Sequence, residues 1–156
     1  MKRLALQSAV LLVLFCAAAA SAQMRIAPAD KDMDAVQKIH LAPFTVEDAQ
    51  NAPLRASLKS ELVHNGFIVL EKQEGSDATL SVEVISGQQG KLAKLETHSL
   101  LDAGPDSRVA WHLSSDKTGP DMAKLVENAA RNIANSLHTY REDVKTKKRE
   151  QKEKQK

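Results

Sequence analysis

Two histidines, His98 and His112, are residues of a type that binds metal ions, and their spacing could bring them together. His98 and His112 each occupy a polar position in a stretch that alternates apolar and polar residues, the pattern of a half-buried strand. If the turn between these stretches pairs Asp102 with Arg108, residue 98 lies opposite residue 112 in an antiparallel pair. Cross-strand Cβ atoms lie ~5 Å apart, so two imidazoles placed in this way can share a metal ion.

Glu83, in the preceding alternating stretch, can face the two histidines and is the third metal candidate. The competing interpretation is an ordinary solvated sheet face, which carries polar residues at the same positions. A single step of register also moves the two histidines out of line. We therefore predict no cofactor, and metal binding by His98 and His112 is the alternative hypothesis.

The sequence contains no pattern that indicates nucleophilic catalysis. Its one cysteine, Cys16, lies in the apolar N-terminal segment described below, and the sequence has no G-x-S-x-G nucleophile motif. The stretch SGQQG, at 86–90, lacks the lysine and helix start of a phosphate-binding loop. A hydrolase would need paired acids in a pocket, and the spacing reveals none. We predict no catalytic residue and no enzymatic activity.

The N-terminal segment 1–22 has the pattern of a secretory signal peptide. Two basic residues precede an apolar run from Leu4 to Ala20, and small residues then place a cleavage site between Ala22 and Gln23. An uncleaved membrane helix is one alternative. A lipoprotein signal at Cys16 is the other, although the bulky Phe15 precedes that cysteine. Cleavage predicts a mature chain of residues 23–156 without cysteine, located in the periplasm or secreted.

Charge is distributed unevenly along the predicted mature chain. Residues 23–144 carry thirteen basic and eighteen acidic side chains, whereas 145–156 carry seven basic and two acidic. The apolar pattern ends at Val144, so 145–156 is predicted to be a disordered basic tail, and a frayed continuation of the helix is the alternative. Its charges suit weak contact with an anionic lipid or polymer, and the alternative is a solvated tail that aids solubility. The tethering candidates are Lys145, Lys147, Lys148, Arg149, Lys152, Lys154 and Lys156. Because the tail has no aromatic residue and the chain is predicted to be exported, we predict no nucleic-acid partner.

Hydrophobic periodicity between the lead-in and the tail predicts a single domain. A flexible lead-in is expected at 23–34 and the domain at 35–144. The helix signature is clearest at 51–67, where Leu54, Leu58 and Leu62 form a stripe and Asn65-Gly66 forms a stop. Strands are expected at 35–44, 67–72, 78–85, 91–101 and 108–113, and a second helix from about 120 to 144. The predicted fold is α+β: one mostly antiparallel sheet of four to five strands, order β-α-β-β-β-β-α, with two helices on one face.

Three dipeptides carry a resemblance to a known class of domain. Pro43-Phe44 ends the first predicted strand, Gly66-Phe67 ends the first helix, and Asp77-Ala78 starts the next strand. Residues 36–115 thereby resemble small periplasmic α/β domains. Such domains occur at the N-terminus of Tol translocation protein B, in the curli secretion channel, and in the outer-membrane lipoprotein that activates a penicillin-binding protein. The sequence departs from them in having no lipid-anchoring cysteine at the predicted mature N-terminus, no β-propeller and no channel-forming insert.

These motifs concern strand ends and a helix cap, so they specify the fold better than the activity. The resemblance implies a non-enzymatic module of an envelope assembly. We therefore expect an exported binding or assembly module of the bacterial cell envelope. It is expected to recognise a protein partner through its sheet face or an exposed strand edge.

Overall fold

The computed structural model describes residues 33–103 and 111–155 of the 156-residue chain. The predicted signal segment with its cleavage site at Ala22 and Gln23, and Arg108 of the predicted turn, lie outside the described residues. The elements follow the predicted order, which confirms the α+β fold. They are a 3-10 helix η3 (Met33–Ala35), strands β1 (Lys38–Leu41), β2 (Ile68–Leu70), β3 (Ala78–Gln89), β4 (Leu92–Asp102) and β5 (Trp111–Gly119), and helices α2 (Asn51–His64) and α3 (Met122–Glu153).

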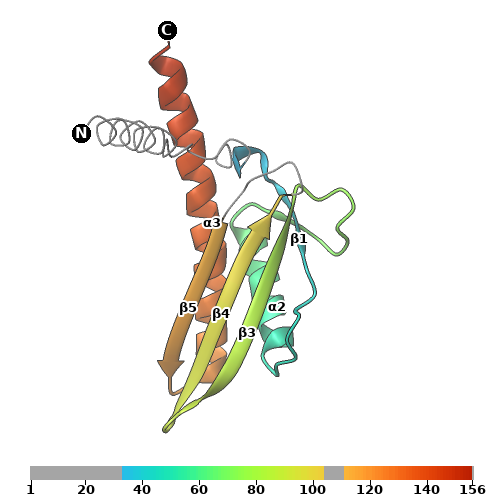
Figure 1. Ribbon diagram of the computed structural model, residues 1–156, viewed down its shortest axis with the longest axis vertical. Coiled ribbons are helices and arrows are strands. Elements are labelled where there is room, and N and C mark those ends of the chain that lie inside the picture. The colour runs from blue at the N-terminus through green and yellow to red at the C-terminus, as the bar shows by residue number, and fades with distance from the viewer. Residues whose placement is uncertain (1–32, 104–110, 156) are drawn as a thin grey trace, which may run out of the picture.

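The five strands form one mixed sheet in the spatial order β2-β1-β3-β4-β5. Figure 1 shows the long strands β3, β4 and β5 side by side. Strand β1 runs parallel to β2, because α2 carries the chain back along the sheet before β2 begins. Strand β1 also pairs parallel with β3, which follows β2 after the segment 71–77. The long strands β3, β4 and β5 pair antiparallel, which is the predicted meander. The sheet is therefore mostly antiparallel, with a short parallel part at the β2 edge.

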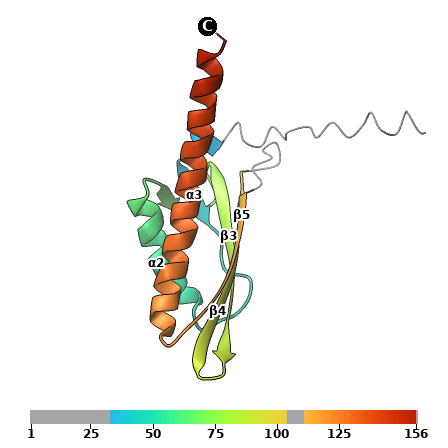
Figure 2. The same cartoon turned by 90° about the vertical axis from the view of Figure 1, so that its left-hand side faces the viewer.

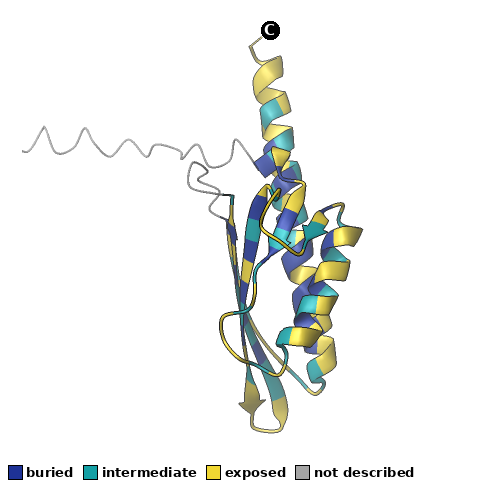
Figure 3. Ribbon diagram, turned by 90° about the vertical axis from the view of Figure 1, so that its right-hand side faces the viewer, coloured by how far each residue is buried: buried dark blue, intermediate teal, exposed yellow. Residues whose placement is uncertain are grey.

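Both helices cover the same face of the sheet, as the edge-on view shows (Figure 2). Alternate residues of β3 and β4 point towards the helices and form the core with the leucine stripe of α2 and the apolar side of α3. The buried side chains include Leu80, Val82, Val84, Leu95, Leu101, Leu54, Leu58, Leu62, Ile133 and Leu137. No helix in the described part of the chain covers the opposite face of the sheet, where Ile85 and Leu100 are exposed (Figure 3).

The end of α2 has the predicted stop. Gly66 adopts a φ of 77°, a left-handed conformation that glycine tolerates well. The Phe67 amide then donates to the Leu62 carbonyl over 3.0 Å, and both side chains are buried. At the start of α2, Asn51 is the first residue of the helix, and its side-chain amide donates to the Val46 carbonyl over 2.6 Å.

The domain begins earlier than predicted and its hairpins are longer. Met33 was assigned to a flexible lead-in, but its side chain is fully buried. The segment 86–90 was expected to be a loop, but β3 continues to Gln89 and pairs with Leu92. Gly90, with a φ of 65°, makes the tight turn between the two strands. Strand β5 likewise extends to Gly119 instead of ending at 113, because β4 supplies a pairing partner along that whole length.

The predicted disordered tail is wrong for residues 145–153, which continue α3 as a helix (Figure 2). Lysine, arginine, glutamate and glutamine all have good helix propensity, so the segment needs no apolar face to extend a helix that is already formed. Two ion pairs support it. Lys145 pairs with Glu142 over 2.7 Å, and Lys148 pairs with Asp34 of η3.

Candidate functional site

The open face is our name for the solvent-facing side of the sheet. It carries the outward residues of every strand, and polar side chains predominate on β3, β4 and β5. Large apolar side chains interrupt this polar surface: Leu100 on β4 is 53% exposed, Ile68 on β2 is 52% exposed and Ile85 on β3 is 46% exposed. Such exposed aliphatic side chains lose water favourably when another surface covers them.

A hollow of about 370 Å³ lies in the open face. Two residues of the loop between β1 and α2 form one wall, and residues of the three antiparallel strands β3, β4 and β5 form the floor. The residues that line it are Pro43, Thr45, Ser81, Val82, Glu83, His98, Ser99, Leu100, His112 and Ser114. All three predicted metal candidates are therefore in this hollow.

The structure brings two of the three candidates into direct register. Glu83 lies opposite His98 across the β3–β4 pair. His98, however, lies opposite Ser114, and His112 lies opposite Leu100. The predicted pairing of residue 98 with residue 112 is wrong by two residues. A two-residue shift keeps every side chain on the same face, so the apolar-polar alternation does not distinguish the two registers.

The ring of His98 is already engaged on both sides. Its Nε2 lies 2.9 Å from the Glu96 carboxylate and its Nδ1 lies 3.0 Å from the Ser114 hydroxyl. With the proton on Nε2, the imidazole donates to Glu96 and accepts from Ser114. His112 is a diagonal neighbour, at the ~7–8 Å spacing of such pairs. In residues 33–103 and 111–155, no three His, Cys, Asp or Glu side chains gather as metal ligands do.

Ser114, His98 and Glu96 follow one another as in a nucleophile, base and acid chain. Acyl transfer also needs hydrogen-bond donors aimed at the developing oxyanion. On a strand face, side chains stand perpendicular to the sheet while the amide N–H groups lie in its plane. The amides of the neighbouring strands therefore do not point at the Ser114 hydroxyl.

The loop wall of the hollow is held by Asp48. Its carboxylate accepts hydrogen bonds from the Ser86 amide at 2.8 Å, the Ser86 hydroxyl at 2.9 Å and the Gln50 amide at 2.7 Å. Burial raises the pKa of Asp48, but these three hydrogen bonds outweigh it and leave the pKa below its ordinary value. Asp48 thus fastens the loop that carries Pro43 and Thr45 to strand β3. The sequence analysis did not assign it a role.

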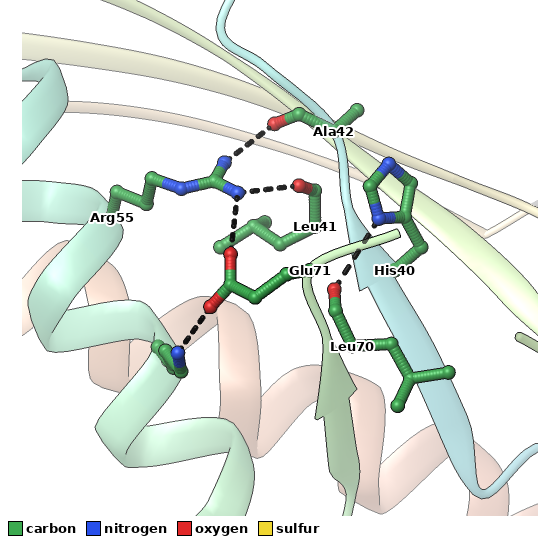
Figure 4. A network of polar contacts seen from close by, with 7 residues as sticks. His40, Leu41, Ala42, Arg55, Leu70 and Glu71 are labelled. Atoms are coloured by element: carbon green, nitrogen blue, oxygen red, sulfur yellow. Dashed lines mark hydrogen bonds and ion pairs between the residues drawn. The ribbon is translucent and has the colours of Figure 1, made fainter. Parts of the chain in front are cut away.

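A second polar network fastens the end of β1 to α2 (Figure 4). Arg55 donates to the carbonyls of Leu41 and Ala42, each over 2.8 Å, and it pairs with Glu71 at 3.8 Å. Lys59 hydrogen bonds to the same carboxylate, which lowers the pKa of Glu71. His40 faces the Leu70 carbonyl over 3.3 Å, within the β1–β2 pair. These contacts position the chain just before Pro43, where the loop wall begins.

The Asp-Ala motif that carried the family resemblance has a structural role here. The Asp77 carboxylate accepts from the Gln37 amide at 2.9 Å and the Lys38 amide at 2.7 Å, while its own amide donates to the Lys38 carbonyl at 2.8 Å. It therefore sets the start of β1 against the start of β3.

Arg141 of α3 is a buried charge that the sequence did not reveal. Its guanidinium lies 4.0 Å above the Phe67 ring. It donates to the carbonyl of Asn65 over 3.1 Å and to that of Gly66 over 3.5 Å. A cation at this place donates hydrogen bonds to main-chain carbonyls at the end of α2 and interacts favourably with the negative end of the helix dipole.

The tethering candidates lie on the part of α3 that passes beyond the sheet. Lys145 and Lys148 are half-buried and paired with Glu142 and Asp34. The hydrogen bond from Lys145 lowers the pKa of Glu142. The side chains of Lys147, Arg149, Lys152 and Lys154 are exposed, and Lys156 lies outside the described residues.

The sequence matches no protein-family model, and a comparison with curated proteins gives no match. Solved structures do share the fold. PelC from Paraburkholderia phytofirmans, described as a dodecamer, superposes with a TM-score of 0.52 at 11% identity and covers 65% of this chain and 86% of its own. A minor lipoprotein from Acinetobacter baumannii matches with a TM-score of 0.44 at 14% identity, over 69% of this chain and 96% of its own.

TolB from Acinetobacter baumannii also matches, with a TM-score of 0.43 at 12% identity over 67% of this chain and 28% of its own. The PelC superposition, with its TM-score above 0.5, supports the predicted resemblance at the level of fold. At these identities the similarity concerns the fold alone. No helix in the described part of the chain has both the length and the apolar composition to span a membrane.

Proposed function

We propose that this chain is an exported, non-enzymatic binding module of the bacterial cell envelope that recognises a protein partner with the open face of its sheet. The observation that supports the proposal is the hollow whose floor includes the exposed Leu100 and whose loop wall is fastened by Asp48. Export rests on the signal pattern at 1–22. The envelope is favoured by the resemblance to periplasmic domains.

The chemistry of the hollow suits a polypeptide. An apolar side chain of a partner can cover Leu100, while Glu83, His98, His112 and Ser114 offer charged and hydrogen-bonding groups around it. An apolar centre with a polar rim is the usual composition of a protein interface. The fastened loop keeps the hollow formed before binding, so little conformational entropy is lost when a partner enters.

Site-specific photocrosslinking in cells tests the proposal on the whole chain. A photoreactive amino acid at Thr45, in the loop wall, is expected to give one defined product. The same group at Ser60, on the outer side of α2, is expected to give none. In the Thr45 background, Leu100→Asp is expected to reduce the product about 30-fold, as for an interface hot spot.

Val63 on α2 supplies a matched control, because it is 56% exposed against 53% for Leu100. Val63→Asp is expected to leave the crosslinked product unchanged. Equal losses in the two aspartate variants, or equal products from Thr45 and Ser60, would refute recognition by the open face. A product with twice the mass of the chain would identify a second copy as the occupant.

A hydrolase is the competing class, because Ser114 and His98 are hydrogen bonded. The proposal predicts that the protein and its Ser114→Ala variant hydrolyse p-nitrophenyl acetate at the same rate. A rate that falls at least tenfold on this substitution would overturn the non-enzymatic proposal.

A further inference from the structure

The last part of α3 stands clear of the domain. Val144, which is 3% exposed, is the last buried residue of the helix, but the helix continues to Glu153. Nine further residues extend it by ~13 Å at 1.5 Å per residue. Figure 2 shows this segment projecting past the sheet and α2. We call residues 145–155 the basic extension.

Charge distinguishes the basic extension from the rest of the domain. It carries six basic and two acidic side chains, whereas residues 33–144 carry eleven basic and sixteen acidic. The net charges are therefore +4 at this end and −5 over the body. An anionic plane attracts the extension and repels the body, so the charge distribution also orients the molecule end-on.

The helix gathers basic residues on one side. Lys145, Lys148, Arg149 and Lys152 follow the i, i+3, i+4, i+7 spacing, which places them within an arc of ~100°. Glu150 and Glu153 fall outside that arc. Lys145 and Lys148 are engaged by Glu142 and Asp34, so contact with an external surface falls mainly to Arg149 and Lys152.

The composition of the basic extension indicates which kind of anionic surface it can bind. It contains no aliphatic or aromatic side chain, so it has neither the apolar face of a membrane-inserting helix nor the apolar centre of a specific protein interface. It also offers no ring on which a nucleobase would stack. A charged helix of this type matches a diffuse layer of phosphate groups, which requires no shape complementarity.

We infer that the basic extension binds peripherally to a membrane surface containing anionic phospholipid headgroups, without insertion. Arg149 and Lys152 make the main contacts, Lys147 and Lys154 add long-range attraction, and the acidic body is held off the membrane. This inference is independent of the open face. A failure of one proposal leaves the other intact.

Vesicle flotation with residues 23–156 tests the inference. Binding to vesicles of phosphatidylcholine with 40% phosphatidylglycerol is expected at 25 mM salt. It is expected to disappear at 300 mM salt and on pure phosphatidylcholine, because exposed charges are screened. The double variant Arg149→Gln/Lys152→Gln is expected to bind about 25-fold more weakly, about fivefold for each basic residue. Glutamine keeps the helix propensity of the replaced residues.

The matched control removes two positive charges elsewhere. Lys91 and Lys124 are exposed, at the β3–β4 turn and in the first turn of α3, at the opposite end of the molecule (Figure 1). Lys91→Gln/Lys124→Gln is expected to keep vesicle affinity within twofold. The inference is wrong if the two double variants weaken binding equally, or if no binding occurs at 25 mM salt. Binding to soluble polyanions such as heparin without binding to vesicles would also overturn it.

Discussion

Replacing Arg141 by methionine is expected to destabilise the domain by about 2 kcal/mol. The guanidinium is nearly buried over the Phe67 ring, where a cation–π contact contributes about 1 to 2 kcal/mol. Its hydrogen bonds to the Asn65 and Gly66 carbonyls add about 1 kcal/mol, because water can reach these partly exposed groups after the substitution. Methionine keeps the length of the side chain and its helix propensity, so the loss reports mainly the charge and its contacts.

Urea unfolding followed by the fluorescence of the single tryptophan, Trp111, measures this change. Trp111 is buried in the folded state, so unfolding exposes it to water. The urea midpoint is expected to fall by roughly 1 M with an unchanged m value. Arg131→Met is the control, because Arg131 forms an exposed ion pair with Glu61 at 3.3 Å and should cost less than about 0.5 kcal/mol. If both variants unfold at the same midpoint as the parent, Arg141 does not cap α2 in the way described.

Three further substitutions test contacts of the fold. Thr97 is buried with no hydrogen-bond partner for its hydroxyl. Thr97→Val is therefore expected to raise the free energy of unfolding by up to about 1 kcal/mol. A decrease of more than about 1 kcal/mol, measured by urea unfolding, would contradict this. Asp77→Ala removes the acceptor of two β1 amides and is expected to cost about 1 to 2 kcal/mol in the same assay, and a neutral result would show that these bonds are dispensable. The pKa of Asp48 is lowered in the fold, so its stabilisation is complete above the ordinary value of 3.8 and is lost as the pH falls through the lower folded pKa. Asp48→Asn is therefore expected to be less stable than the parent at pH 6, with the difference shrinking below pH ~4, whereas a pH-independent difference would exclude this linkage.

Much of the fold was predictable because its signals are local. The alternation in 78–85 and 91–101 predicted which side chains of β3 and β4 face the helices. The Asn65-Gly66 stop predicted the end of α2, since only glycine takes a positive φ at little cost. The strand ends were less predictable. The stretch SGQQG at 86–90 has the composition of a loop, but β4 supplies a pairing partner that extends β3 to Gln89.

The sequence predicted which metal candidates lie near one another, but it did not predict how the strands that carry them pair. Glu83, His98 and His112 all line the hollow. The register of β5 on β4, however, depends on the length and path of the preceding turn, and a shift of two residues leaves the facing pattern intact. The engagement of His98 by Ser114 follows from that register. The loop wall held by Asp48 and Ser86 joins residues 38 positions apart, a contact that no sequence periodicity encodes.

The sequence by itself determined the α+β architecture, the buried sides of its strands and helices, and the separation of an acidic body from a basic C-terminal segment. These features depend on residue order over a few positions, where backbone geometry sets the period. Only the tertiary structure decided the register of the histidines, the capping of α2 by Arg141 and the continuation of α3 through the basic segment. Each of these depends on contacts between segments far apart in the chain, or on a helix already formed by packing to which further residues add at little cost.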